Sequence, residues 1–217
     1  MIATKKEIEV TKTARYYQLG ELNQSTKEVW LVCHGYGMLA EYFIRKFDVL
    51  LNDETVIIAP EAMSRFYNSG TSGRVGASWM TKDDRLVDIQ DNLNYMNQLM
   101  DMVQSKVNKE QVRFRLLGFS QGSPTAARWM HQSNWKPDVY ISWASDIPVD
   151  VLQPENKATW RETEVIIACG DEDQFISAQR LETHLQTLKD YGLSFEMISF
   201  QGDHRIYPAV LLELKET

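Results

Sequence analysis

Three segments of the chain carry side chains that could perform acyl transfer, and each segment follows a short apolar run. Ser120 lies in Gly-Phe-Ser-Gln-Gly, Asp171 and Asp173 lie in Gly-Asp-Glu-Asp, and His204 ends Gly-Asp-His. A serine hydroxyl becomes nucleophilic when a histidine accepts its proton, and an acid orients that histidine. The order serine, acid, histidine differs from the orders in trypsin-like and subtilisin-like proteases. These residues predict nucleophilic catalysis by Ser120.

The context of Ser120 matters more than the pentapeptide, because a Gly-x-Ser-x-Gly occurs by chance in roughly one chain in fifteen of this length. Apolar residues at 112–117 indicate a strand, and small residues after Ser120 open a helix. A serine on so sharp a turn takes strained backbone angles, and Gly118 and Gly122 let neighbouring backbone pass. The helix N-terminus then faces any negative charge formed beside the serine. An ordinary strand-turn-helix with glycines at the turn is the alternative.

Composition limits the fold and the partners. The 217 residues, 43% hydrophobic and 24% charged, predict one domain over 1–217. The net charge of −7 argues against nucleic acid or an anionic membrane as partner. No stretch has signal-peptide or membrane-span character, so we expect a cytoplasmic location and no membrane insertion. Cys33 and Cys169 lack metal-ligand spacing. We expect no metal and no cofactor, and the oligomeric state stays open.

The apolar pattern predicts an α/β fold. Short apolar runs typical of buried parallel strands lie at 29–33, 55–59, 112–117, 139–144, 164–169 and 195–198. Helical spacing lies between them, at 42–51, 86–103, 181–188 and 206–214 and after Ser120. Strands that alternate with helices predict a mostly parallel sheet with helices on both faces.

Three further segments carry weaker expectations. Residues 7–21 predict two short strands at an antiparallel edge. Residues 61–78, rich in glycine and serine, predict a long flexible loop. Thr81 with Asp84 resembles a capping box at the start of the long helix.

Ligands of such sheets bind at the carboxyl ends of the strands, where the three candidate segments lie. The sequence resembles the phospholipase/carboxylesterase branch of the α/β-hydrolases, to which acyl-protein thioesterase-like enzymes belong, across roughly residues 28–212. The resemblance rests on an apolar strand before His-Gly-Tyr-Gly at 34–37, on Leu-Leu-Gly-Phe-Ser-Gln-Gly, on Gly-x-x-Asp and on Gly-x-His. It departs at Met38, where the branch usually has Asp, at Ser123, where it has a second glycine, and in the short Ser78-Trp79-Met80 segment. It implies an α/β-hydrolase fold, and no insertion is long enough for a large cap domain.

The roles follow from acyl transfer. His204 would take the Ser120 proton, and the backbone N–H groups of Tyr36 and Gln121 would form the oxyanion hole. Asp173 is the expected acid, because it is the last residue of Gly-x-x-Asp and lies far enough beyond the strand to reach the histidine loop. Asp171 should bond backbone N–H groups in the turn.

The other histidines have structural interpretations. His34 is expected to shape the His-Gly-Tyr-Gly loop, by hydrogen bonds to backbone, and His131 and His184 are expected on helix surfaces. Ser177 remains free to cap the helix that follows Asp173.

Seven residues beside the strand ends could line an acyl pocket or simply close the core: Met38, Leu39, Trp79, Ile147, Pro148, Phe175 and Ile176. The leading hypothesis is a serine hydrolase that cleaves carboxylic esters or thioesters of small to medium acyl groups through an acyl-enzyme on Ser120. The alternatives are a catalytically silent scaffold that serves as a binding module, a dienelactone-hydrolase-like enzyme, whose usual nucleophile is cysteine, and a peptidase.

Overall fold

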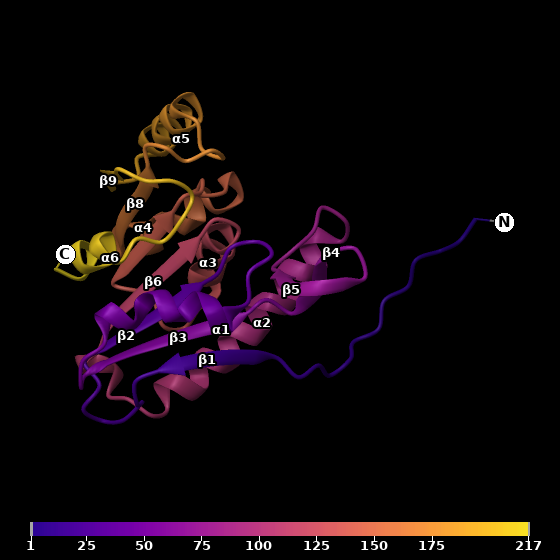
Figure 1. Ribbon diagram of the computed structural model, residues 1–217, viewed down its shortest axis with the longest axis horizontal. Coiled ribbons are helices and arrows are strands. Elements are labelled where there is room, and N and C mark those ends of the chain that lie inside the picture. The colour runs from indigo at the N-terminus through magenta and orange to yellow at the C-terminus, as the bar shows by residue number, and fades with distance from the viewer. Residues whose placement is uncertain (1, 217) are drawn as a thin grey trace.

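A seven-stranded sheet forms the centre of the molecule, in the order β1-β3-β2-β6-β7-β8-β9 (Figure 1). The computed structural model describes residues 2–216. Only β1 runs antiparallel to its neighbour. The strands are β1 (Arg15–Leu19), β2 (Glu28–Cys33), β3 (Thr55–Glu61), β6 (Arg113–Phe119), β7 (Val139–Trp143), β8 (Glu164–Gly170) and β9 (Glu196–Phe200). The predicted mostly parallel sheet is confirmed.

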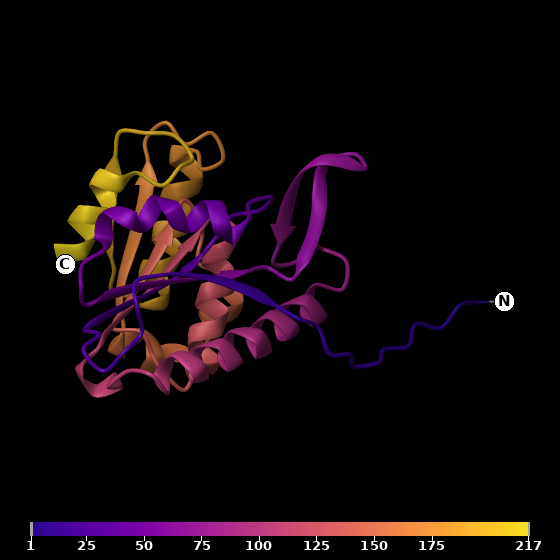
Figure 2. The ribbon, with the colours of Figure 1, turned by 60° about the horizontal axis from the view of Figure 1, so that its bottom comes forward.

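Helices cover both faces of the sheet, which explains why its strands are continuous apolar runs (Figure 2). Alternate residues of β2 pack into two separate cores, with Leu31 on one side and Trp30 on the other. One face carries α2 (Arg85–Gln104), α3 (Gly122–Gln132), α4 (Lys157–Glu162) and α5 (Ala178–Tyr191). The other carries α1 (Ala40–Phe43), the 3₁₀ segment η1 (Ile44–Leu50) and α6 (Pro208–Glu216). Short 3₁₀ turns complete the chain at Lys109–Gln111, Val149–Val151 and Pro154–Asn156.

The expected flexible loop at 61–78 is wrong. β3 continues to Glu61, and β4 (Ser64–Ser69) and β5 (Ser72–Ser78) form an antiparallel hairpin that projects from the body (Figure 2). The hairpin has almost no buried apolar face, so it lacks the alternation that identifies a strand in a sequence. Its pairing is supplied by backbone hydrogen bonds and by its junction with the turn at 35–38.

The remaining differences lie at element ends. Residues 2–14 form no regular structure, so the N-terminal segment supplies one edge strand and not two. The long helix begins at Arg85, and Asp84 precedes it in the left-handed region at φ +53° with no side-chain cap. Thr81 therefore does not cap it, and Leu86, expected on the buried face, is 80% exposed because the first turn projects past the core. The helix predicted over 42–51 divides into α1 and η1, with Tyr42 exposed.

No large cap covers the carboxyl edge of the sheet: between β7 and β8 the chain forms only two 3₁₀ turns and the short α4. No helix within residues 2–216 combines the length and apolarity that crossing a bilayer requires.

Candidate active site

Ser120 occupies the turn between β6 and α3 with a strained backbone, at φ +51°. A non-glycine residue in this region costs on the order of 1–2 kcal/mol, so surrounding contacts must hold it there. The Ser120 N–H donates to the Trp143 carbonyl over 2.9 Å. A side chain at Gly118 would collide with the Cα of Ser123, and one at Gly122 would collide with the carbonyl of Cys33. The two glycines of the motif therefore allow the close approach that the turn needs, as expected.

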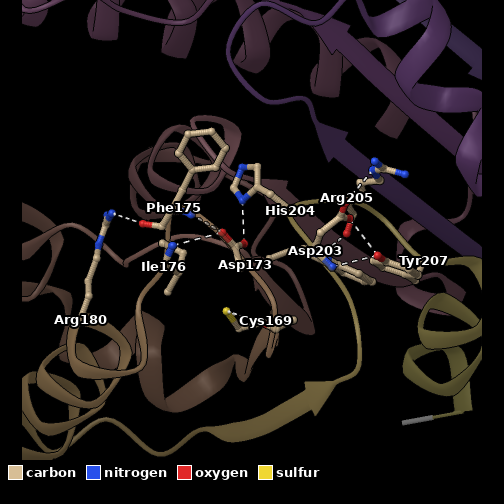
Figure 3. A network of polar contacts seen from close by, with 11 residues as sticks. Cys169, Asp173, Phe175, Ile176, Arg180, Asp203, His204, Arg205 and Tyr207 are labelled. Atoms are coloured by element: carbon tan, nitrogen blue, oxygen red, sulfur yellow. Dashed lines mark hydrogen bonds and ion pairs between the residues drawn. The ribbon is translucent and has the colours of Figure 1, made fainter.

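Asp173 and His204 meet above the ends of β8 and β9 (Figure 3). The Asp173 Oδ2 lies 2.7 Å from the His204 Nδ1, and the Asp173 side chain is inaccessible to solvent. Its Oδ1 accepts from the N–H groups of Phe175 and Ile176 over 2.8 and 3.1 Å. Both oxygens are thus hydrogen-bonded, which a buried carboxylate requires. Asp171 instead accepts from the Gly202 N–H over 3.0 Å, on the histidine loop rather than within its own turn.

Ser120 and His204, the expected nucleophile and base, are not hydrogen-bonded to each other. No hydrogen bond joins the Ser120 hydroxyl to His204 among the hydrogen bonds of residues 2–216. The imidazole nevertheless lies beside the turn between β6 and α3, because its ring centroid is 4.9 Å from that of Phe119, the residue before Ser120. Such contacts often tighten only when substrate binds.

The loop that carries His204 is fixed by residues that sequence analysis did not identify. The Tyr207 hydroxyl accepts from the Asp203 N–H over 2.9 Å and donates to the Asp203 carboxylate over 2.8 Å. The Trp143 indole donates to the Arg205 carbonyl over 2.9 Å. The two bonds hold Asp203 and Arg205, which precede and follow His204 in the chain, and Figure 3 shows Asp203, Arg205 and Tyr207 together on one side of the imidazole. The spacing of Asp203 and Tyr207 carries no sequence signal of its own.

Two backbone N–H groups are available to bind an oxyanion. Within residues 2–216, no protein acceptor takes a hydrogen bond from the N–H of Tyr36 or of Gln121. The Gly35 carbonyl belongs to the same peptide group as the Tyr36 N–H, and it accepts from the His34 Nδ1–H over 2.8 Å. Because the two groups of a trans peptide point in opposite directions, this bond directs the Tyr36 N–H outward.

His34 has the structural role expected of it. Its Nε2 accepts from the Ala62 N–H over 3.1 Å while its Nδ1 serves Gly35, so the network assigns a neutral ring with the proton on Nδ1. Burial lowers the pKa of His34 to about 4, which keeps the ring neutral at pH 7.

The side chain of Gln121 has a second, unexpected function. Its carboxamide accepts from the Trp79 N–H over 3.0 Å and donates to the Met80 carbonyl over 2.8 Å. It therefore ties the nucleophile turn to the segment between β5 and α2. A glutamine directly after Ser120 gives no hint of this partner in the sequence.

Some of the candidate pocket residues are accessible to solvent, and others are buried in the core. Phe175 is 60% exposed and its ring centroid lies 4.7 Å from that of His204, and Met38 is half-buried. Ile176 is buried below the acid turn. Trp79 and Ile147 belong to the core, and the Trp79 indole donates to the His34 carbonyl over 2.8 Å. A pocket role for Trp79 is therefore wrong, since its ring has no accessible surface.

Leu39 and Pro148 are half-buried, so their pocket role stays a prediction.

His131 and His184 are not simple helix-surface residues. His184 is buried, and its Nε2 accepts from the Ile147 N–H over 3.1 Å. His131 packs edge-on against Trp160, with both ring nitrogens buried and without a partner among residues 2–216. Burial lowers the pKa of His184 and lowers that of His131 to about 4. The position of a histidine in a helix does not show whether it is buried when the segment packed against it is short, as α4 is beside His131 and the Ile147 loop is beside His184.

Comparison with solved structures defines the class of the fold. The chain is similar to acyl-protein thioesterase 2 from Zea mays, with 17% identity, 94% of this chain and 97% of that chain covered, and a TM-score of 0.68. It is also similar to a phospholipase/carboxylesterase from Dyadobacter fermentans, at 19% identity, 96% and 98% coverage and a TM-score of 0.62. A carboxylesterase from Bacillus cereus matches at 12% identity, 94% and 92% coverage and a TM-score of 0.60. The fold is therefore that of an α/β-hydrolase.

The family follows from the sequence. The model of the Phospholipase/Carboxylesterase family matches residues 18–217. The chain belongs to this family and is a hydrolase, which confirms the resemblance found in its motifs. A comparison with curated proteins finds no significant match.

Proposed function

We propose that the protein is a serine esterase or thioesterase that forms an acyl-enzyme on Ser120. The observation that carries the proposal is the Asp173–His204 hydrogen bond of 2.7 Å beside a serine held at φ +51°. A strained serine next to a carboxylate-bound histidine has no purpose in a silent scaffold, because the strain and the buried carboxylate both oppose folding.

The geometry supports a two-step acyl transfer. The Ser120 Oγ attacks the substrate carbonyl carbon, and its proton passes to the His204 Nε2. The resulting oxyanion accepts hydrogen bonds from the N–H groups of Tyr36 and Gln121, which are worth about 3–4 kcal/mol each in such sites. His204 then protonates the departing alcohol or thiol, and water repeats the sequence to release the acid. Asp173 stabilises the imidazolium and holds its Nδ1–H.

We further propose a small-molecule ester or thioester with a small to medium acyl group as substrate. The open carboxyl edge, with Phe175 and Met38 beside the reacting residues, supports an accessible apolar binding surface. The net charge of −7 argues against nucleic acid as a partner. A single domain and a cytoplasmic location stay predictions of the sequence.

Fluorophosphonate labelling tests the nucleophile directly. We expect the probe to label the wild-type protein stoichiometrically on Ser120 and not to label Ser120→Ala, whose ester hydrolysis should fall by several powers of ten. Equal melting temperatures of the two proteins provide the folding control. A Ser120→Ala variant that retained a tenth of wild-type turnover on p-nitrophenyl butyrate would remove Ser120 from this role. Cleavage of peptide amides faster than of esters would favour the peptidase alternative.

A further inference from the structure

The acid turn between β8 and α5 has a support that acyl transfer itself does not require. Asp173 is held through the backbone of Phe175 and Ile176, so the position of its carboxylate depends on where that backbone lies. The Phe175 ring also packs edge-on against the His204 imidazole. A displacement of this short segment would therefore move two of the groups that contact His204, the Asp173 carboxylate and the Phe175 ring.

Arg180 fixes the segment from the helix side. Its Nη1 donates to the Phe175 carbonyl over 3.0 Å, as Figure 3 shows. Its Nε and Nη2 lie 2.9 and 2.8 Å from the Asp146 Oδ2, on the segment that follows β7. The planar guanidinium fork can serve both partners at once, whereas an ammonium group has no such fixed geometry. Arg180 thus links the turns that follow two neighbouring strands.

Helix stability does not explain this arginine. Arg180 lies in the first turn of α5, where the helix dipole disfavours a cation. The Asp146 Oδ1 is buried without a partner among residues 2–216, which adds a further cost. The segment that follows β7 has a second bond to α5. The Ile147 N–H donates to the His184 Nε2, which lies one helical turn beyond Arg180. Because the Arg180 and Asp146 side chains are 50% and 34% accessible, their ion pair adds little to folding stability, so stability alone does not explain it.

We propose that Arg180, anchored by Asp146, is a positioning residue that holds the Phe175 segment so that Asp173 and the Phe175 ring fix the imidazole of His204. This inference rests on the proposed function, since it assigns Arg180 to the same site. Arg180 touches no reacting atom. It acts through Asp173, and its loss should matter only while Asp173 is present.

The central variant is Arg180→Met, which keeps the length of the side chain and removes the fork. We expect kcat on p-nitrophenyl butyrate to fall at least tenfold with KM changed less than twofold, and the acidic limb of the pH–rate profile to move. Arg180→Lys, which can keep one of the two partners, and Asp146→Asn should show smaller losses in the same direction. Arg161→Met, an exposed arginine on α4, is the matched control and should equal the wild type.

A double-mutant cycle separates positioning from general destabilisation. In the Asp173→Asn background, Arg180→Met should cost less than twofold further, because the group through which it acts is already lost. A purely structural role predicts the full tenfold loss in both backgrounds and would overturn the proposal. If Arg180→Met does not fold, the same cycle is measured with Asp146→Asn.

A measurement independent of turnover distinguishes this proposal from the proposed function. The His204 Nδ1–H, bonded to a buried carboxylate, should give a low-field proton resonance that is absent in His204→Gln. Arg180→Met should broaden or shift it, and Arg161→Met should leave it unchanged. A wild-type protein without esterase activity or probe labelling contradicts the proposed function, while the resonance still reports the Arg180 contact. An Arg180→Met variant with unchanged resonance and kcat within twofold of wild type contradicts the positioning role.

Discussion

Arg115 and Arg180 lie at opposite ends of the sheet and have different roles. Arg115 stabilises the fold, whereas the role proposed for Arg180 is to position the acid turn. Arg115, on β6, is buried and bonds the Glu28 carboxylate over 2.8 Å and the carbonyls of Leu214 and Lys215 over 2.9 Å each. Those carbonyls belong to the last turn of α6, where the helix dipole favours a cation. Arg180 lies in the first turn of α5, where the dipole disfavours it.

The difference extends to the surroundings of each arginine. Arg115 has its hydrogen-bonding groups satisfied within a packed environment, with the guanidinium 5.2 Å from the Trp30 ring. At the carboxyl end, a strained Ser120 and the unbonded N–H groups of Tyr36 and Gln121 remain, together with an unpartnered oxygen of Asp146. The strained serine and the open N–H groups lie where the substrate is proposed to bind, as expected of a prepared site. Buried atoms without a partner are not confined to that end among residues 2–216, since they also include the Trp30 Nε1, beside Arg115, the Asn92 Oδ1 and the ring nitrogens of His131.

The largest expected effect lies at the carboxyl end. Asp173→Asn should lower kcat by roughly 10³–10⁴-fold, because the amide can donate to Nδ1 and so favours the tautomer of His204 that cannot accept the serine proton. The unfolding free energy should change little by comparison, since the backbone N–H groups of Phe175 and Ile176 still find an oxygen. Steady-state kinetics and denaturant unfolding measure the two effects separately. A loss of kcat below tenfold in a folded variant would move the orienting role away from Asp173.

At the Arg115 end of the sheet, we expect a substitution to change the unfolding free energy much more than kcat. Arg115→Met should lower the unfolding free energy by about 3–5 kcal/mol, because Glu28, with a side chain only 13% accessible, loses its guanidinium partner and the last turn of α6 loses two donors. Glu28 then keeps the Thr55 hydroxyl at 3.3 Å and the Lys215 ammonium at 4.0 Å. The kcat per folded molecule should stay within twofold of wild type. Arg45→Met, which breaks an exposed pair with Glu41, is the control and should cost less than about 1 kcal/mol. A large fall in kcat for Arg115→Met without unfolding would show that the two ends are coupled.

Features that depend on local sequence were predicted well. The buried strands were visible because both faces of the sheet are covered, so each strand is a continuous apolar run. Ser177 was predicted to cap α5, and its Oγ accepts from the Arg180 N–H over 3.2 Å. Gly192 ends the same helix at φ +82°, a left-handed conformation that glycine adopts readily. Each of these signals is complete within a few residues.

Features that depend on distant partners were not predicted. The hairpin β4–β5 is attached through backbone bonds between Ala77 and the residues Gly37 and Met38, and backbone groups leave no mark on residue type. Tryptophan is a residue type that often lines pockets, but the Trp79 ring is buried in the core and its indole N–H donates to the His34 carbonyl. Arg180 looked like any exposed helix residue, because its significance depends on Phe175 and Asp146 on other segments.

A third prediction concerns acid stability at the carboxyl end. The folded-state pKa of His34 is lowered to about 4 by burial, below the unfolded value near 6.5. The unfolded chain therefore binds more protons between these values, and the unfolding free energy falls as pH decreases from 6.5 to 4. His34 should account for on the order of 3 kcal/mol of this fall. His34→Gln should flatten the curve of unfolding free energy against pH by that amount, with His131 contributing part of the remaining slope. An unchanged slope in the folded variant would show that His34 does not titrate in this range.

The smallest expected effect is at Asp171. It tests whether the two aspartates of one turn have different roles, one in catalysis and one in stability. Asp171 is two residues from Asp173, yet its carboxylate accepts from the Gly202 N–H, at 3.0 Å, rather than from the imidazole. Asp171→Asn keeps an oxygen in place and removes the charge, so the unfolding free energy should fall by about 1 kcal/mol. The value of kcat should stay within a few-fold of wild type, because His204 keeps its partner. Asp53→Asn, at an exposed position before β3, is the matched control and should change neither quantity. If Asp171→Asn lowered kcat as much as Asp173→Asn in equally stable variants, the acid role would belong to the turn as a whole rather than to one carboxylate.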